Sequence, residues 1–200
     1  MQAERIPVVV GVGAVNRQAE DPSTIGEPIA LMEEAIRLAA QDAGADSLLA
    51  AVDEITVPRG FWAYSDPGRL LADRIGATGA RTVLAEIGIL QSSLLGRAAA
   101  RIAAGQSEVA ILVGGEAHDR AARLGRAGKA VPLTVQTGVA PDVQLEPASE
   151  IMGRHEIELG LVTPTIQYAV IDNALRFAEG RTLDEHKAEL GRLWRSEERL

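Results

Sequence analysis

Residues 81–116 constrain the fold of this chain most strongly, because they change from strand periodicity to helix periodicity and back again. Residues 82–85 form a short β-prone run, and residues 109–113 are almost all apolar, as in a parallel strand buried on both faces. Residues 90–104 between them are rich in Ala and Leu and end at Gly105, which tolerates the positive φ of a helix C-cap. The stretch predicts a strand–helix–strand unit with a right-handed crossover.

The helix predicted over residues 90–104 is apolar around most of its circumference, which is typical of a helix inside a large protein. Its polar stripe is narrow and runs through Ser93, Arg97 and Arg101. We therefore expect the helix to lie buried between two layers of structure. Arg97 and Arg101 lie one turn apart, so they form either a solvated or interface stripe or a pair that holds an acidic partner.

Strands and helices alternate along residues 1–117, which predicts an α/β fold with a mainly parallel sheet. We expect a buried first strand over residues 7–12, helices over 27–43 and 69–75, and a strand over 52–57. Residues 118–145 have little periodicity, and a loop of that length is usually functional, a lid or a partner contact. Further helices are predicted over residues 149–159, 163–178 and 182–194, the last opened by a capping box from Thr182 to Glu185.

Composition excludes several classes of protein. The net charge is −8 with no basic patch, which argues against a nucleic-acid partner but leaves an anionic small ligand open. No apolar run approaches the roughly 20 residues of a membrane span. The chain has no cysteine, which removes disulfides, thiolate metal sites and a cysteine nucleophile. The first 20 residues lack a signal-peptide pattern, and we expect a cytoplasmic location.

Few residues stand out as carriers of chemistry. The spacing of the three histidines matches no metal site, so surface or capping roles are favoured for His118, His155 and His186. Gly11 and Gly13 resemble a dinucleotide fingerprint only faintly, because the third glycine and an immediate helix are missing. Glu116 follows a strand end, where sites of α/β proteins often lie, and is a weak catalytic candidate or an ordinary hydrogen-bonding residue.

The loop over residues 61–67 is unusual in a chain that is poor in aromatic residues. Its Trp62 and Tyr64 either line the mouth of a substrate site or anchor the loop to the core.

The ordered set of segments resembles the N-terminal half of a thiolase. The segments are the helix end Ala98-Ala-Ala-Arg-Ile-Ala-Ala-Gly105, the strand Val109-Ala-Ile-Leu-Val-Gly-Gly-Glu116, Asp66-Pro67, Gly88-Ile-Leu-Gln91, Pro141-Asp142 and the ending from Tyr168 to Trp194. They are most similar to actinobacterial thiolase-like proteins labelled acetyl-CoA acetyltransferases, akin to the sterol-carrier thiolases. The resemblance implies a five-layer αβαβα fold of which residues 1–117 are the N-terminal α/β core. Residues 118–200 would complete that half with a loop region and helices, and the C-terminal half would be absent.

The resemblance also marks two departures from the family. A thiolase has its nucleophilic cysteine at the start of the buried helix, where the helix dipole lowers the thiol pKa. Gly88 occupies that position here, and it either leaves a substrate-binding pocket together with Ile89 and Trp62 or forms a plain turn. Ser92 and Ser93 are the nearest hydroxyls, but a serine nucleophile needs a base within reach and none is local.

The function implied by the resemblance is that of an acyl-CoA-handling protein of lipid or steroid metabolism without the cysteine nucleophile. A coenzyme A thioester would be its substrate, no cofactor would be tightly bound, and thiolase activity is not expected of this chain alone. We expect a homodimer that pairs the edge strand beside the central helix, or a complementing subunit that supplies the C-terminal half. The alternatives are an aldol lyase of CoA-linked side chains acting with an OB-fold partner, and a non-catalytic binding or assembly subunit.

Overall fold

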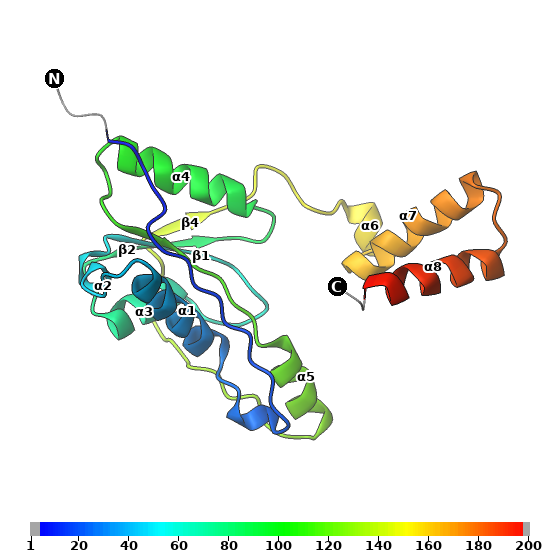
Figure 1. Ribbon diagram of the computed structural model, residues 1–200, viewed down its shortest axis with the longest axis horizontal. Helices are drawn as coiled ribbons and strands as arrows, with labels where there is room; N and C mark the ends of the chain where they lie inside the picture. Colours follow the sequence, from blue (N-terminus) through cyan, green and yellow to red (C-terminus); the bar gives the residue numbers. More distant parts are fainter. Residues whose placement is uncertain (1–4, 198–200) are drawn as a thin grey trace. The chain divides into compact units, whose positions relative to one another are not determined.

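A computed structural model describes residues 5–197, with side chains up to residue 195 (Figure 1). The chain divides into two compact units, unit 1 up to Ala148 and unit 2 from Ser149 onward. Unit 1 includes residues 118–148, which fasten onto the sheet and helices that precede them. The predicted boundary between a thiolase-like core of residues 1–117 and the remaining residues 118–200 stays a prediction.

Unit 1 is built on a sheet of four parallel strands in the order β3–β1–β2–β4. The strands are β1 (Glu54–Pro58), β2 (Arg81–Ala85), β3 (Ala110–Leu112) and β4 (Val143–Leu145). β1 and β2 are buried along most of their length. The apolar run over residues 109–113 was expected to be buried on both faces, but β3 within it is an edge strand and only half-buried, so that expectation is wrong. The predicted fold class, α/β with a mainly parallel sheet, is confirmed.

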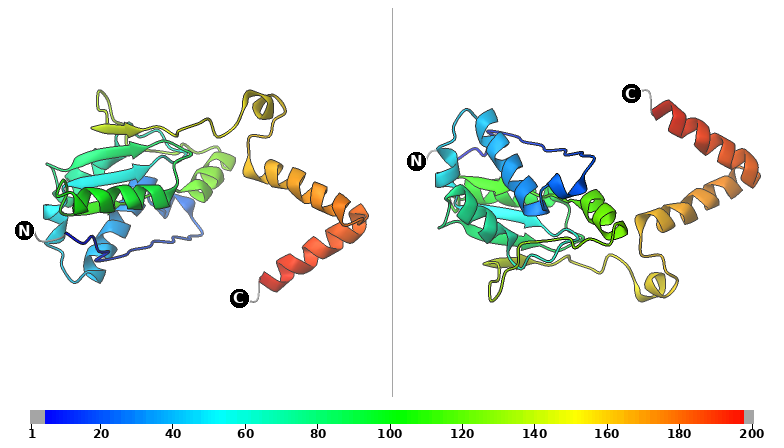
Figure 2. Two further views of the ribbon diagram at one scale, coloured as in Figure 1. Left: turned by 90° about the horizontal axis from the view of Figure 1, so that it is seen from above. Right: turned by 90° about the horizontal axis from the view of Figure 1, so that it is seen from below.

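Helices cover both faces of this sheet (Figures 1 and 2). Helices α1 (Pro28–Asp42) and α3 (Pro67–Ile75) pack on one face, where Ile55, Val57 and Leu84 enter the core with Met32 and Leu71. Helix α4 (Gln91–Ala103) lies on the opposite face. The short elements η1 (Pro22–Thr24), α2 (Leu48–Ala51) and α5 (His118–Arg126) connect these parts. Because only a short turn separates them, the C-terminal end of β2 lies beside the N-terminus of α4.

The predicted first strand over residues 7–12 is wrong. The segment belongs to no strand, and Val8, Val9 and Val10 are 58–71% exposed. It lies against α1 through Gly11 and Gly13, where any Cβ atom would overlap the carbonyl oxygens of that helix. Because glycine lets the two backbones approach this closely, the segment packs on a helix instead of pairing in the sheet. The apolar run correctly predicted extended backbone but not its surroundings.

Helix α4 is one residue shorter at each end than the helix predicted over residues 90–104, and Gly105 follows it with a φ of +69°. Its surroundings differ from the expectation of two covering layers. Leu94 is its only buried residue, while Leu90 and Leu95 are 66% and 52% exposed. Within unit 1 the sheet covers one side of α4, and Leu90 and Leu95 lie on the exposed side. The expectation that a C-terminal half supplies the second layer stays a prediction.

The polar stripe of α4 faces the sheet. Arg97 Nη1 lies 2.6 Å from Oε1 of Glu54, and Arg101 Nε lies 2.8 Å from Oε2 of the same carboxylate. Glu54 is on β1 and only 1% exposed. A buried carboxylate needs compensating charge, and the two guanidinium groups provide it. Of the two interpretations of this arginine pair, the acidic partner is therefore confirmed and the solvated stripe is wrong.

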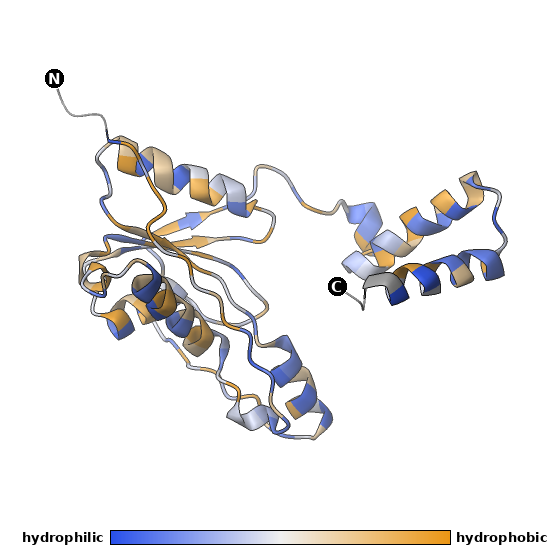
Figure 3. Ribbon diagram, viewed as in Figure 1, coloured by the Kyte–Doolittle hydropathy of each residue, from blue (hydrophilic) through white to orange (hydrophobic). Residues whose placement is uncertain are grey.

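Unit 2 consists of α6 (Arg154–Glu158), α7 (Pro164–Ala178) and α8 (Leu183–Glu197). The capping box is confirmed, because Thr182 N donates to Oε2 of Glu185 at 2.8 Å and Glu185 N donates to Oγ1 of Thr182. A surface role is wrong for His186, which is 6% exposed and contacts Asp172. Helix α7 has no buried residue, and its ribbon in Figure 3 carries both hydrophobic and hydrophilic colours along its length. No helix within residues 5–197 could cross a membrane.

Candidate functional site

A cavity of about 360 Å³ opens at the N-terminus of α4. Three short stretches of unit 1 form it: the turn after β2, the first two turns of α4, and the end of β4 with the residues that follow. Most of its walls are apolar, and the lining residues are Gly88, Ile89, Leu90, Ser93, Leu94, Arg97, Leu145, Glu146, Pro147 and Ala148. The fold therefore joins a largely apolar cavity to the start of a helix.

The first turn of α4 has backbone donors that remain unused. Ser93 N and Leu94 N donate to the carbonyl oxygen of Leu90, and no side chain caps the helix. Within residues 5–197 neither Gln91 N nor Ser92 N donates a hydrogen bond. The N-terminus of a helix carries partial positive charge through such groups. A carbonyl oxygen or an anion can accept from them.

Gly88 lies in the turn between β2 and α4, three residues before the first helical residue Gln91. Its φ is +109°, a conformation that a residue with a Cβ atom adopts only with strain. Gly88, at the position where the resemblance places a cysteine, thus has no side chain and lines the cavity with its backbone.

The charges around the cavity are largely paired. Arg97 is the only cationic lining residue, and Glu54 neutralises it from the sheet side. Glu146 lies at the opposite wall and accepts a hydrogen bond from Gln144 Nε2 at 2.9 Å. No histidine is among the lining residues, so Ser93 has no imidazole base beside it. The cavity provides binding surface and backbone donors, with no nucleophile–base pair.

The structure brings together only some of the predicted site residues. Gly88 and Ile89 line the cavity, but Trp62 and Glu116 do not. Trp62 is buried in the core of unit 1, where its Nε1 donates to the carbonyl oxygen of Gly115 at 3.1 Å. Glu116 accepts from Phe61 N at 2.6 Å. These contacts anchor the aromatic loop beside the end of β3, and no finding tests a role in substrate binding or catalysis for either residue.

Tyr64 anchors the other end of the aromatic loop. Its hydroxyl donates to Oε2 of Glu27 at 2.9 Å and accepts from Ile29 N. Burial, together with the Glu27 carboxylate, raises the pKa of Tyr64 above its usual value. Burial would also raise the pKa of Glu27, but hydrogen bonds from Thr134 and Tyr64 outweigh it and the pKa falls. The pair therefore remains a neutral phenol bound to a carboxylate and stabilises the start of α1.

Sequence analysis missed the wall formed by residues 145–148. β4 has only three residues, which is too short for an alternating pattern to predict a strand. The available signal was Pro141-Asp142 directly before it, a pair already noted for its resemblance to the thiolase-like proteins.

Asp142 fastens this wall to the sheet. Its Oδ2 accepts from Thr82 N at 2.8 Å, and its own N–H donates to Oγ1 of Thr82. Arg69 Nη2 lies 3.1 Å from the same carboxylate oxygen. After the strand, Glu86 N donates to the carbonyl oxygen of Leu145. The Asp142 carboxylate thus adds one more hydrogen bond between the two strands, directly before the first paired residue of β4.

This fastening is expected to depend on acidity. The hydrogen bond from Thr82 N, aided by the charges of Arg69 and Arg81, holds the pKa of Asp142 below its usual 3.8, although burial opposes the shift. Asp66 is the second carboxylate near Thr82, and it accepts a hydrogen bond from the Thr82 hydroxyl. Because the folded-state pKa is lowered, the carboxylate contributes stability above pH 3.8 that is lost as the pH falls through the folded-state value. The Thr82 amide resonance should therefore titrate with a midpoint below 3.8; a midpoint at or above that value would contradict the assignment.

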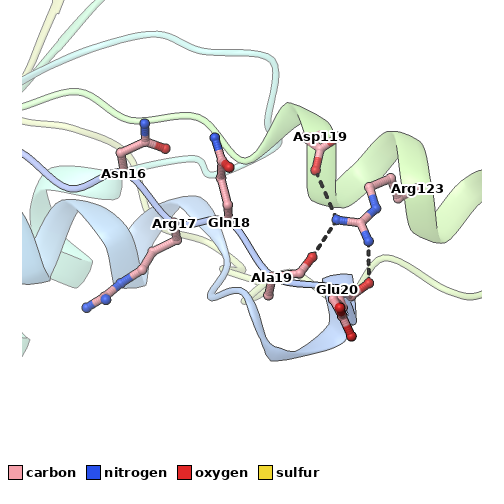
Figure 4. A pocket seen from close by; sticks show the side chains of 7 residues that line it. All are labelled: Asn16, Arg17, Gln18, Ala19, Glu20, Asp119 and Arg123. Atoms are coloured by element: carbon pink, nitrogen blue, oxygen red, sulfur yellow. Dashed lines mark hydrogen bonds and ion pairs between the residues drawn. The ribbon is translucent and has the colours of Figure 1, made fainter.

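A second cavity, of about 620 Å³, lies between the N-terminal segment and α5 (Figure 4). Arg123 is its central cation, and it donates to the carbonyl oxygens of Ala19 and Glu20 and pairs with Asp119. Arg17 points away from that cluster and pairs with Glu34. Since the guanidinium is already bonded within the chain, this cavity offers less to a ligand than the one at α4.

Comparisons with known proteins support the fold alone. No profile of a known protein family matches the sequence, and no curated protein matches it. Among solved structures the chain is similar to a monomeric SCP2-thiolase-like protein type 1 from Mycobacterium smegmatis, with 24% sequence identity and a TM-score of 0.57. The similarity covers 93% of this chain but 33% of that protein, so this chain spans about a third of its length. The chain thus has a thiolase-like α/β fold.

Proposed function

We propose that this chain binds an acyl-coenzyme A thioester non-covalently in the cavity at the N-terminus of α4. The protein would handle acyl-CoA in lipid or steroid metabolism, as the resemblance to sterol-carrier thiolases implies, without forming an acyl-enzyme. The observation that supports the proposal is the combination of apolar walls with the unbonded N–H groups of Gln91 and Ser92, which belong to the helix turn beside the cavity without lining it. An acyl chain suits the walls, and a thioester carbonyl suits the donors.

The absence of covalent chemistry follows from the residues of the chain. It contains no cysteine, and Gly88 provides only backbone at the cavity. Ser93 is the one lining hydroxyl, and a serine needs an adjacent base to become nucleophilic. A non-catalytic binding subunit agrees with this arrangement, and so does a protein whose catalytic groups come from another polypeptide.

We also propose that another polypeptide covers the outer face of α4. Leu90 and Leu95 are exposed there, and this chain corresponds to a third of the length of its solved neighbour. A homodimer that pairs the edge strand beside the central helix stays a prediction. The edge strands of the sheet are β3 and β4.

Substitution of Ser93 by Trp is expected to weaken binding of a medium-chain acyl-CoA by at least about tenfold, or about 1.4 kcal/mol. The indole would fill the cavity that Ser93 lines. Isothermal titration calorimetry with octanoyl-CoA, and with free coenzyme A for comparison, measures the loss.

The matched control is Ala100→Trp, since Ala100 is exposed on the same helix but neither lines the cavity nor belongs to the first turn that supplies the N–H donors. Equal effects of the two substitutions, or none from Ser93→Trp, would place the ligand elsewhere. Mass spectrometry of the incubated protein adds an independent test, because an acyl adduct on the intact chain would disprove the non-covalent mode.

A further inference from the structure

We propose that residues 142–148 form a movable wall of the α4 cavity, fastened by Asp142, and that separation of β4 from β2 opens the cavity to its ligand. The inference rests on the proposed function only for the identity of that ligand. It explains the segment of residues 118–145, which sequence analysis assigned to a lid, a functional loop or a partner contact.

The wall depends on β4 remaining paired. Leu145, Glu146, Pro147 and Ala148 form one side of the cavity, and the turn after β2 and α4 form the other. The first residue of this wall is itself the last residue of β4, paired with Ala85. If β4 leaves the sheet, that side of the cavity is lost while the donors of α4 stay in place.

β4 is one of the two weakly attached strands of the sheet. Like β3, it is three residues long and pairs on one edge only, whereas β1 and β2 each have a strand on both sides. Its Val143 and Leu145 are half-buried, unlike the buried residues of β1 and β2. Regions with few buried apolar side chains and exposed hydrogen bonds open at the lowest free energy. The Asp142 contacts therefore account for much of what holds the strand.

The chain before Asp142 is built to allow this movement. Gln136 is fixed by two hydrogen bonds to the backbone of Asp66, at 3.0 Å and 2.8 Å. Residues 137–141 make no hydrogen bond to any residue between 5 and 197. Within them Gly138 has a φ of +67° and open space around it. The segment therefore has three parts in chain order. Gln136 is held by Asp66, residues 137–141 can change conformation around Gly138, and Asp142 holds β4 to Thr82.

Hydrogen exchange of the full chain without ligand tests the proposal. Thr82 and Glu86 donate their amides to the movable wall, whereas Arg81 N donates to Asp53 and Val113 N donates to Thr56. We expect protection factors of Thr82 and Glu86 at least about tenfold below those of Arg81 and Val113 in the native protein. The Asp142→Ala substitution should lower the first two by about a further tenfold and leave the other two unchanged. Asp46→Ala, which removes an exposed acid without side-chain contacts, is the control.

The outcomes separate the wall from the proposed ligand. Equal loss of protection at all four amides in Asp142→Ala would mean general destabilisation and would overturn the proposal, as would no change at Thr82 and Glu86. Stopped-flow association of octanoyl-CoA should be faster in Asp142→Ala than in Asp46→Ala if the wall limits entry. An unchanged association rate in a protein that binds the ligand would reject the gating role. Selective exchange with no acyl-CoA binding in any variant would support the movable wall and reject the proposed function.

Discussion

Replacement of Glu54 by Gln is expected to lower the free energy of unfolding of unit 1 by about 3 kcal/mol, the lower end of what breaking a buried ion pair costs. The substitution keeps the shape of the side chain and removes its charge. Arg97 and Arg101 would then lie under α4 without their carboxylate. Urea unfolding followed by Trp62 fluorescence measures the loss, in a Trp194→Phe background that removes the second tryptophan.

The control for Glu54 is removal of all three charged groups together. The triple substitution of Glu54, Arg97 and Arg101 by Met leaves no unpaired charge, and such replacements are often neutral or stabilising. We expect its stability to approach that of the native chain. A Glu54→Gln protein within about 0.5 kcal/mol of native stability would show that the cluster is hydrated and energetically unimportant.

The Asp66→Ala substitution is expected to cost about 2.5–4 kcal/mol. Oδ1 of Asp66 caps α3 by accepting from Arg69 N at 2.9 Å, and loss of such a cap costs about 1 kcal/mol. Oδ2 accepts from the hydroxyl of Thr82, which keeps Asp142 Oδ2 at 3.3 Å as a second acceptor, so the cost is that of one hydrogen bond to a charged group, about 1.5–3 kcal/mol more. Thermal or urea unfolding with the same Trp62 probe measures the sum.

Asp66→Asn is the matched variant, since its side-chain oxygen can still cap α3 while its charge is gone. It should lose clearly less stability than Asp66→Ala. Identical losses in the two variants would mean that charge, and not the cap, accounts for the contribution of this residue. The Gln136 contacts go to the backbone of residue 66, so both substitutions retain them.

The central elements of the fold were predictable because their local signals agree with their tertiary surroundings. The predicted helix over residues 27–43 is α1, and the predicted strand over residues 82–85 lies within β2. Pro28 and Gly105 mark helix ends for local steric reasons, which a sequence displays directly.

The predictions from the sequence were wrong where the structure depends on contacts with a segment far away along the chain. Residues 7–12 have the composition of a buried strand, yet pairing requires a neighbouring strand, and their glycines contact α1 instead. The sides of α4 were misjudged because two arginines suggest solvent unless the buried Glu54 opposite them is known. β4 is too short to produce a period, and its place depends on contacts from Asp142 to Thr82.

The role of the predicted site residues stays a prediction, but the structure shows where they lie. Counting along the sequence placed Gly88 and Ile89 at the start of the central helix, and both line the cavity there. The opposite wall comes from residues far along the chain, which no local pattern connects to Gly88. Trp62 and Glu116 were selected by residue type and by position after a strand, and these criteria do not report where a side chain points.

The connectivity of β4 has a kinetic consequence. Asp142 meets Thr82 across 60 positions of sequence, whereas β1 and β2 are joined by a much shorter crossover. Closing a long loop to gain a three-residue ladder brings little enthalpy for the entropy lost, so such contacts form late on a folding route. The nascent sheet would therefore first assemble as β1–β2, and the two edge strands β3 and β4, each held by a three-residue ladder, would dock afterwards.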